Sequence, residues 1–401
     1  MRYTIIGAGA AGIAAAKTLR KLDPDGRIVV VSSDKDVHSR CMLHKLISGE
    51  RSKADIRFIE EDFFEAYDIG WMMGVTISGI DPSEKMLRTS GGNLPYDKLL
   101  IATGADSVIP PVGALRSADN VFGLRHLSDA EAIREKALGA KRIIVIGAGL
   151  VGLDAAYALI ELGKKPLVVE MEDRVLPLNL DKRGAETYRN LFESHGCVFR
   201  LGRRVADTKT VNSSISEILL DNGEVLPCDM VVVAAGVRPA IQFLEGCGVD
   251  YDRAVIVDAR MRTNVPDIYA AGDVTGLSGI WPNAVEMGEI AAMNMAGRET
   301  VYDDTYAIKN TLNFFGVATL SIGALEPGEG DSVYIRESRK RYDKVILRDG
   351  VAKGVILQGD ISYGGFWQHI IKNRIKIDDP VWKTSYADYF GVTQSGEYIY
   401  S

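Results

Sequence analysis

Residues 2–34, RYTIIGAGAAGIAAAKTLRKLDPDGRIVVVSSD, decide the fold of the N-terminal part of this 401-residue chain. A β-branched run, a glycine-rich turn, an alanine-rich segment and a second apolar run predict strand, turn, helix and strand. Gly7, Gly9 and Gly12 have the spacing G-x-G-x-x-G. Gly7 is expected to allow a tight turn, Gly9 to let the backbone approach a pyrophosphate, and Gly12 to let helix and strand pack closely. The helix N-terminus would then present free N–H groups to the phosphates.

A carboxylate near the end of the second strand binds a ribose in this motif. Asp34 is the candidate here, although Ser32 and Ser33 lie between it and the apolar run. Ala11, inside the turn, is also expected to contact the cofactor.

The pattern recurs in residues 141–177, KRIIVIGAGLVGLDAAYALIELGKKPLVVEMEDRVLP. Gly147, Gly149 and Gly152 form the turn, and the second strand ends in Glu170. One such motif is weak evidence, but two in the full strand–turn–helix–strand context predict two bound dinucleotides. Glu170 would accept hydrogen bonds from a free 2′-hydroxyl and repel a 2′-phosphate, which favours NADH over NADPH.

Composition excludes several classes of protein. The net charge of -7 argues against a nucleic-acid or anionic-membrane binder, and no apolar run is long enough to span a bilayer. The cysteines are too few and too scattered for a disulfide framework or a zinc site, so no metal is expected and a reducing cytoplasm is the predicted location. They are Cys41, Cys197, Cys228 and Cys247, and the last three are expected to be buried and structural.

Three further segments carry short motifs, Ala102-Thr103-Gly104, Ala235-Gly236 and Gly272-Asp273. Together with the paired turns they resemble the pyridine nucleotide–disulfide oxidoreductase superfamily over roughly residues 1 to 320. The resemblance implies an α/β fold with two Rossmann-like dinucleotide-binding domains and a small α+β C-terminal domain. It places FAD at the first turn, the Ala-Thr-Gly and the Gly-Asp, and NADH at the second turn and Gly236. The implied domains are 1–112 with 240–305 for FAD, 113–239 for NAD, and 306–401 at the C-terminus.

Residues 40–45 carry R-x-x-L-x-K, which resembles a motif of rubredoxin, ferredoxin and nitrite reductase-type NADH reductases. That branch uses Arg40 and Lys45 against the flavin and its phosphates. Lys45, as the catalytic residue, and the end of a helix near residues 284 to 290 would stabilise charge on the reduced flavin.

Other positions follow from the same branch. VFGLRHLSDA is similar to its V-x-x-L-R-x-L-x-D-A segment, which makes Arg125 an FAD contact. WPNAVEMGEIAAMNMAG is similar to its W-x-x-A stretch and puts Trp281 and Glu286 near the isoalloxazine. Asp154 stands where the branch usually has Glu, so its role beside the nicotinamide rests on a side chain that is one methylene shorter.

From about residue 305, short alternating runs and one helix-like segment predict an antiparallel sheet domain. Residues 331–376 hold ten Lys or Arg against five Asp or Glu. Such a run is usually a solvated hairpin; the sharper interpretation is a docking surface for a small acidic electron-carrier protein. The aromatic tail, VWKTSYADYFGVTQSGEYIY, would pack on the sheet or on a second subunit, and the chain is expected to be a monomer or a homodimer.

Cys41 leaves two functions open. The resemblance implies a FAD-dependent NADH:acceptor oxidoreductase that passes electrons to a rubredoxin- or ferredoxin-like carrier, with Cys41 as a bystander. The alternative is a single-cysteine NADH oxidase or peroxidase, or a coenzyme A-disulfide reductase, in which Cys41 is catalytic. Arg40 and Lys45 are expected to depress the pKa of its thiol, and a surface or capping role is expected for His38 and His44.

Overall fold

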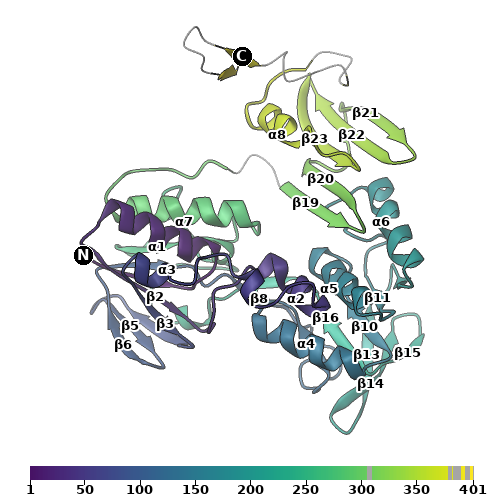
Figure 1. Cartoon of the computed structure of the whole chain (residues 1–401), viewed down its shortest axis with the longest axis horizontal. Coiled ribbons are helices and arrows are strands. Elements are labelled where there is room, and N and C mark those ends of the chain that lie inside the picture. The colour runs from purple at the N-terminus through teal and green to yellow at the C-terminus, as the bar shows by residue number, and fades with distance from the viewer. Residues whose placement is uncertain (305–308, 378–381, 383–389, 393–397, 401) are drawn as a thin grey trace. The chain divides into compact units, whose positions relative to one another are not determined.

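The structure is a computed structural model that describes residues 1–304, 309–377, 382, 390–392 and 398–400 (Figure 1). The chain divides into two compact units. The first is Met1–Val175 with Phe192–Asp304, and the second is Leu176–Leu191 with Thr305–Ser401. Nothing in the sequence indicated that Leu176–Leu191 groups with the C-terminal residues.

The first unit contains a parallel five-stranded sheet with the order β18-β7-β1-β2-β3. Its strands are β1 (Arg2–Ile6), β2 (Arg27–Ser32), β3 (Ile69–Met73), β7 (Lys98–Ile101) and β18 (Ile268–Ala270). The strand order reverses beside β1, and ligands of open α/β sheets bind at such a point, outside the carboxyl ends of the strands.

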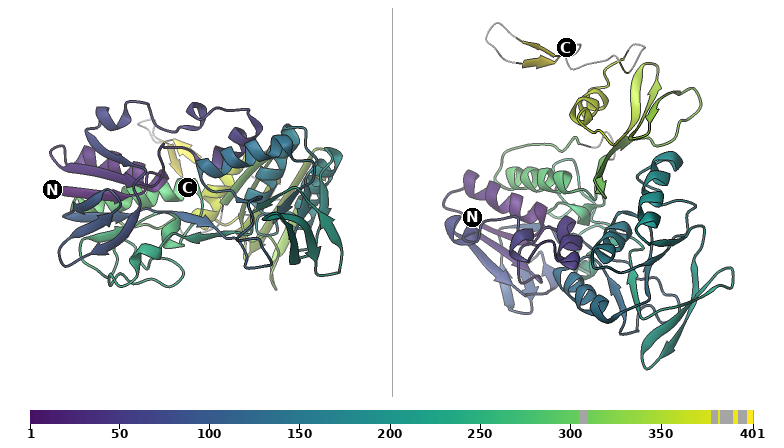
Figure 2. Two further views of the ribbon diagram at one scale, coloured as in Figure 1. Left: turned by 90° about the horizontal axis from the view of Figure 1, so that it is seen from below. Right: turned by 45° about the vertical axis from the view of Figure 1, so that its right-hand side comes forward.

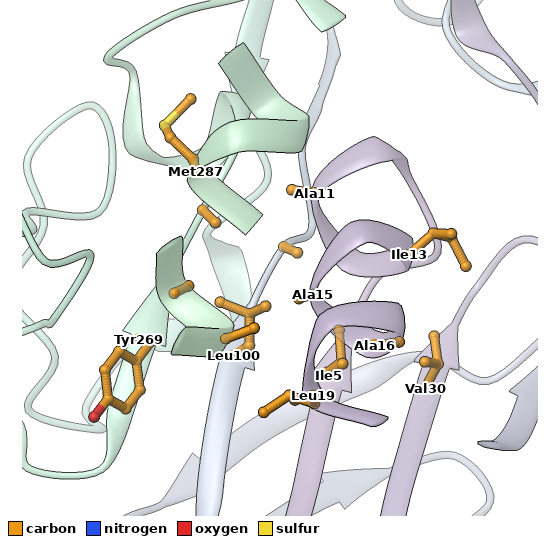
Figure 3. Packing of buried hydrophobic residues seen from close by; sticks show 14 of the residues in the cluster. Ile5, Ala11, Ile13, Ala15, Ala16, Leu19, Val30, Leu100, Tyr269 and Met287 are labelled. Carbon is orange, nitrogen blue, oxygen red and sulfur yellow. The ribbon is translucent and has the colours of Figure 1, made fainter. Parts of the chain in front are cut away.

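Helices α1 (Ala10–Leu22) and α7 (Trp281–Met295) lie side by side against one face of this sheet (Figures 1 and 2). Figure 3 shows the small side chains of Ala11 and Ala15 on α1, with Leu100 of the sheet in the same cluster. A Cβ on Gly288 of α7 would lie 2.2 Å from the carbonyl oxygen of Ala11. Small residues on both helices therefore let the two backbones approach closely.

A second parallel sheet of the same kind follows, with the order β12-β11-β10-β16-β9. Its strands are β9 (Val121–Gly123), β10 (Ile143–Ile146), β11 (Leu167–Val169), β12 (Val198–Arg200) and β16 (Met230–Val233). Helices α4 (Leu127–Gly139) and α5 (Leu150–Glu161) pack against it. The two predicted strand–turn–helix–strand units are thus both present.

Smaller elements complete the first unit. Two three-stranded antiparallel sheets and one strand pair accompany the two parallel sheets. They are β4 (Ile77–Asp81), β5 (Met86–Thr89) and β6 (Gly92–Pro95); β13 (Val205–Val211), β14 (Ser214–Leu220) and β15 (Val225–Pro227); and β8 (Ala105–Ser107) with β17 (Val237–Pro239). The short helices are α2 (Leu43–Ser48) and α3 (Phe63–Ala66).

The second unit is the predicted antiparallel sheet, with the order β19-β20-β23-β22-β21. Its strands are β19 (Lys309–Phe314), β20 (Val317–Gly323), β21 (Ser332–Ser338), β22 (Arg341–Arg348) and β23 (Val351–Gln358). Helix α8 (Gly364–Lys372) covers one face through Phe366 and Trp367. Of the aromatic tail, β24 (Phe390–Val392) and β25 (Tyr398–Tyr400) are described as an antiparallel pair; most of the tail lies outside the described residues.

Helix α6 (Lys182–Ser194) begins beside a buried ion pair of the second unit. Lys344 Nζ donates to Asp181 Oδ2 at 2.8 Å, and the Tyr342 hydroxyl donates to the same oxygen at 2.6 Å. The side chains of Lys344 and Asp181 are 7% and 5% exposed. A segment encoded between the strands of the second parallel sheet is therefore bonded to the C-terminal sheet. Within the described part of the chain, no helix has the length and apolar character needed to cross a membrane.

Candidate active site

The first glycine turn has the geometry that its sequence predicts. Gly7 has φ +108°, and a Cβ there would lie 2.2 Å from the carbonyl oxygen of Ala102. A Cβ on Gly12 would lie 1.9 Å from the carbonyl oxygen of Gly7, so helix and turn are in backbone contact. A Cβ on Gly9 would meet no protein atom within 4 Å. Gly9, the middle glycine of the motif, therefore leaves a hollow at the N-terminus of α1, which a phosphate could occupy.

The second turn repeats this geometry. Gly147 has φ +105°, and its Cβ would lie 2.4 Å from the carbonyl oxygen of Ala234. A Cβ on Gly152 would lie 2.0 Å from the carbonyl oxygen of Gly147, and one on Gly149 would meet nothing within 4 Å. Each turn therefore leaves open space beside its middle glycine, at the N-terminus of a helix of twelve or thirteen residues, and we refer to these two spaces as the glycine hollows.

A cavity opens around the first turn. Most of the residues predicted to bind FAD line it: Gly7, Gly9, Ala11, Asp34, Arg40, Ala102, Thr103, Gly104, Arg125, Gly272, Asp273 and Trp281. Cys41 lines it as well. Gly12, Lys45 and Glu286 are not in its wall. The predicted residues therefore converge on one cavity, while their contact with FAD stays a prediction.

Two arginines and two carboxylates form pairs in this cavity. Arg125 Nη2 donates to Asp273 Oδ2 at 2.5 Å, and Arg40 Nη2 lies 3.4 Å from Asp34 Oδ2. Arg125 also donates from Nε to the carbonyl oxygen of Ala105 at 2.8 Å. These bonds fix both guanidinium groups at the cavity wall, where a diphosphate would meet them.

Sequence reasoning missed His126, which lines the same cavity. Its Nε2 lies 3.1 Å from Asp106 Oδ1 and its Nδ1 lies 3.6 Å from Asp34 Oδ1. The hydrogen bond to Asp106 and then the interaction with Asp34 raise the pKa of His126 to about 9. The available signal was its place directly after Arg125.

Strand pairing shows why the position of Asp34 was hard to fix. Ile6 pairs with Val31 in the first sheet, as Ile146 pairs with Val169 in the second. Ser32 is therefore the equivalent of Glu170, and Asp34 lies two residues further on. Burial opposes ionisation of Asp34, but the interaction with His126 and the charge of Arg40 lower its pKa.

Glu170 holds the second turn. Its Oε2 accepts from the backbone N–H of Ala148 at 2.6 Å, and its Oε1 accepts from the N–H of Glu172 at 2.9 Å. Gly236, predicted to contact NAD, has φ +100° and lies three residues after the end of the neighbouring strand β16. Both residues therefore lie at the carboxyl edge of the second sheet, beside the hollow at Gly149.

Lys45 and Asp154 lie where α2 packs against α5. Lys45 Nζ is paired with Glu50 Oε2 and lies 5.4 Å from the ring centre of Tyr157. Asp154 Oδ1 lies 3.8 Å from His44 Nδ1. Burial raises the pKa of Asp154 to about 7, while burial and then the charge of Lys45 lower the pKa of His44 to about 4. The Lys45 side chain thus points to the end of α2 rather than to the cavity.

Two expectations about the neighbourhood of Cys41 are wrong. Cys41 is exposed, yet the pKa of its thiol is raised, not depressed, because partial desolvation and the charge of Asp154 outweigh the nearby cations. His38 is not at the surface; it is 5% exposed, and its Nε2 has no hydrogen-bond partner among the described atoms.

The predicted helix end near residues 284 to 290 is the middle of α7, whose N-terminal end at Trp281 lines the cavity instead.

Cys197, Cys228 and Cys247 are all buried, as predicted. Burial raises the pKa of Cys197 to about 12 and that of Cys228 to about 11, so these thiols are inert. Among the described residues, no group of three or more His, Cys, Asp or Glu could hold a metal ion.

Residues 1–288 match the model of the pyridine nucleotide-disulphide oxidoreductase family. The chain belongs to this family. Residues 309–375 match the rubredoxin NAD+ reductase C-terminal domain. The chain is therefore an FAD- and NADH-dependent oxidoreductase of mixed α/β fold with a small C-terminal domain. The glycine hollow at α1 and the arginines fixed beside it suit the diphosphate of FAD.

Named relatives cover nearly the whole chain. It is 31% identical to the NADH-dependent phenylglyoxylate dehydrogenase subunit epsilon of Aromatoleum evansii, over 93% of this chain and 92% of the relative. It is 34% identical to an NADH oxidase of Methanocaldococcus jannaschii, over 87% and 80%. It is 27% identical to the NADH-rubredoxin oxidoreductase of Clostridium acetobutylicum, over 90% and 92%. Among solved structures, an NAD-dependent persulfide reductase from A. fulgidus superimposes with a TM-score of 0.87 at 28% identity, covering 96% of this chain and 79% of the other.

Proposed function

We propose that this family member oxidises NADH and passes the electrons through FAD to a rubredoxin- or ferredoxin-like carrier protein. The observation that carries the proposal is the joining, in one chain, of two glycine hollows for dinucleotides to a domain of the rubredoxin NAD+ reductase type. The relative from Clostridium acetobutylicum, whose name states this reaction, is matched over 92% of its length. We place the reaction in the cytoplasm on the cysteine content of the sequence.

FAD supplies the redox chemistry, since a flavin accepts electrons as a pair and can release them singly. The chain's own task is to bind and orient. The N–H groups at the start of α1 and the side chains of Arg40 and Arg125 would hold the FAD diphosphate. The N-terminal end of α7, at Trp281, would direct the positive end of the helix dipole toward the isoalloxazine part of FAD. Lys45 remains our prediction for the group that stabilises the reduced state.

NADH would bind at the second hollow, around Gly149. The carboxylate of Glu170 accepts hydrogen bonds from two backbone N–H groups, which fix it at the place where the ribose hydroxyls are read. NADPH would bring a phosphate to that carboxylate and is disfavoured.

The exposed turn of the β21–β22 hairpin is our candidate docking surface for an acidic carrier. Several basic side chains of residues 331–376 are paired within the second unit: Arg336 and Arg341 with Asp343, Lys344 with Asp181, and Arg348 with Asp331. Arg339 and Lys340 lie in the turn and are exposed. The hairpin predicted from the charge run is present, and its tip still carries the positive charge that would speed an encounter.

Rates with different acceptors test the proposal. NADH-dependent turnover should be fastest with rubredoxin or ferredoxin, and slower with oxygen, peroxide or coenzyme A disulfide. The double variant Arg339→Glu/Lys340→Glu should lower kcat/KM for an acidic carrier by about tenfold at low salt, and less at high salt. Arg253→Glu, at an exposed site of the first unit, is the matched control. Equal rates for both variants would refute the docking surface, and slow turnover with every carrier would refute the function.

A thiol-dependent reaction is the second candidate, because Cys41 lines the cavity and the chain is 34% identical to a named NADH oxidase. The raised pKa of Cys41 argues against it, since the thiolate is the reactive form. Turnover with peroxide or a disulfide that collapses in Cys41→Ser, while ferricyanide reduction persists, would establish this reaction in place of ours.

A further inference from the structure

We infer that His126 is a cofactor-binding residue, acting as an imidazolium between Asp34 and Asp106 that keeps the FAD cavity electrically neutral. The inference rests on FAD being the cofactor of the first turn and is independent of the electron acceptor.

The geometry shows that both ring nitrogens of His126 face carboxylates. Nε2 lies 3.1 Å from Asp106 Oδ1 on β8, and Nδ1 lies 3.6 Å from Asp34 Oδ1 in the loop after β2. A neutral imidazole carries one N–H, whereas the imidazolium presents an N–H to each carboxylate. It donates to Asp106, and its charge attracts Asp34, which at 3.6 Å lies just beyond hydrogen-bond distance. The ring is held in place because His126 precedes α4 and its backbone N–H donates to Asp129 Oδ2 at 2.8 Å.

The charges around this cavity balance only when His126 is protonated. Its wall carries three carboxylates, and the guanidinium groups of two arginines. The carboxylates are Asp34, Asp106 and Asp273, and the arginines are Arg40 and Arg125. His126 supplies the third positive charge. Without it the wall has a net charge of minus one facing a diphosphate, which carries two negative charges.

Other ionisable groups near His126 would not produce the same pH dependence of FAD binding. Arg40 opposes its protonation, and Asp129 is engaged with the backbone at the start of α4. The imidazole of His38 is buried, and burial lowers its pKa, so it is neutral at pH 7. Cys41 lines the cavity and titrates at alkaline pH, so its contribution must be removed in the test.

The pH dependence of FAD binding follows from these contacts. The pKa of His126 in the ligand-free protein is about 9, and the negative charge of FAD would raise it further. Between these two pKa values the dissociation constant of FAD should rise about tenfold per pH unit, because FAD binding then requires the uptake of one proton. Below pH 8 it should be flat.

Equilibrium ultrafiltration of the holoenzyme between pH 7 and 10 tests this inference, with free FAD measured by its fluorescence. The experiment uses the Cys41→Ser background beside the wild type. His126→Gln keeps a hydrogen-bonding side chain without the charge, and should weaken FAD binding about tenfold at pH 7 and abolish the alkaline loss. His126→Lys should retain FAD at pH 9.5 better than the wild type. His195→Asn, at an exposed site directly after α6, is the matched control and should behave as the wild type.

The pH dependence of FAD release in Asp106→Asn distinguishes an electrostatic role of His126 from a purely structural one. It removes the main partner that raises the pKa of His126, so FAD release should begin at a lower pH than in the wild type. An unchanged dissociation constant and an unchanged pH profile in His126→Gln would overturn the inference. So would a profile in Asp106→Asn that matches the wild type. A wild-type protein that binds no FAD at any pH would overturn the cofactor assignment and this inference with it.

Discussion

Two alanine substitutions in the second glycine turn should have opposite effects. At Gly149 a Cβ meets no protein atom within 4 Å, and the backbone is in an extended conformation (φ −73°, ψ −170°) that alanine adopts freely. Gly149→Ala should therefore leave the free energy of unfolding unchanged or raise it by about 0.4–1 kcal/mol. The new methyl group fills the hollow that we assign to the NADH diphosphate, so the dissociation constant of NADH should rise at least about tenfold, or about 1.4 kcal/mol.

At Gly152 the same methyl group has no space. It would lie 2.0 Å from the carbonyl oxygen of Gly147, which is about 1.4 Å closer than the ordinary contact distance of 3.4 Å. The helix must shift away from the turn, and overpacking of this kind costs about 1–3 kcal/mol. Thermal unfolding should therefore begin several degrees lower in Gly152→Ala, at about 2–4 °C per kcal/mol.

The bound flavin reports both effects, because the first turn is unchanged in either variant. Stopped-flow bleaching of the flavin at increasing NADH concentrations gives the dissociation constant, and thermal unfolding is followed separately. FAD content should equal that of the wild type in Gly149→Ala. The reasoning is refuted if Gly149→Ala lowers the unfolding temperature as much as Gly152→Ala, or if it binds NADH as tightly as the wild type.

Three further predictions concern individual side chains. Iodoacetamide should modify the exposed Cys41 slowly at pH 7 and faster as the pH rises past 9, because partial desolvation and the charge of Asp154 raise its pKa. Cys41→Ser should abolish that labelling, and fast modification at pH 7 would contradict the prediction. Lys344→Met should destabilise the second unit by about 3–5 kcal/mol in thermal unfolding, because it leaves the buried carboxylate of Asp181 uncompensated. The double variant Lys344→Met/Asp181→Leu should recover much of this loss, and a double variant no more stable than the single one would argue against the ion pair. Asp154→Asn should stabilise the protein at pH 8 but not at pH 4. The folded-state pKa of Asp154, about 7, exceeds the unfolded value, so ionisation of the native carboxyl costs stability as the pH rises from 4 to 7. An equal gain in stability at both pH values would contradict that pKa.

Much of the site could be predicted from short stretches of sequence. The clash partner of Gly12 is Gly7, five residues away, and that of Gly152 is Gly147. Each contact lies within its own turn, and only glycine has room at Gly12 and at Gly152. The residue types at these positions therefore reveal the geometry of the turn without any knowledge of the rest of the fold. The apolar runs that flank each turn determine the two parallel sheets in the same way.

Tertiary structure decided the ionisation of the side chains, because their partners come from distant segments. His126 lies between carboxylates that are 20 and 92 positions away in the chain, and no local pattern indicates that both meet one imidazole. Lys45 and Cys41 were judged from their sequence neighbours, but the packing of α2 turns Lys45 toward Glu50, and partial desolvation and the charge of Asp154 raise the pKa of the exposed Cys41 thiol. A pKa depends on every charge and on all the water within several ångströms of a group. The sequence alone therefore determined where the backbone turns, and only the folded chain determined which of its groups are charged.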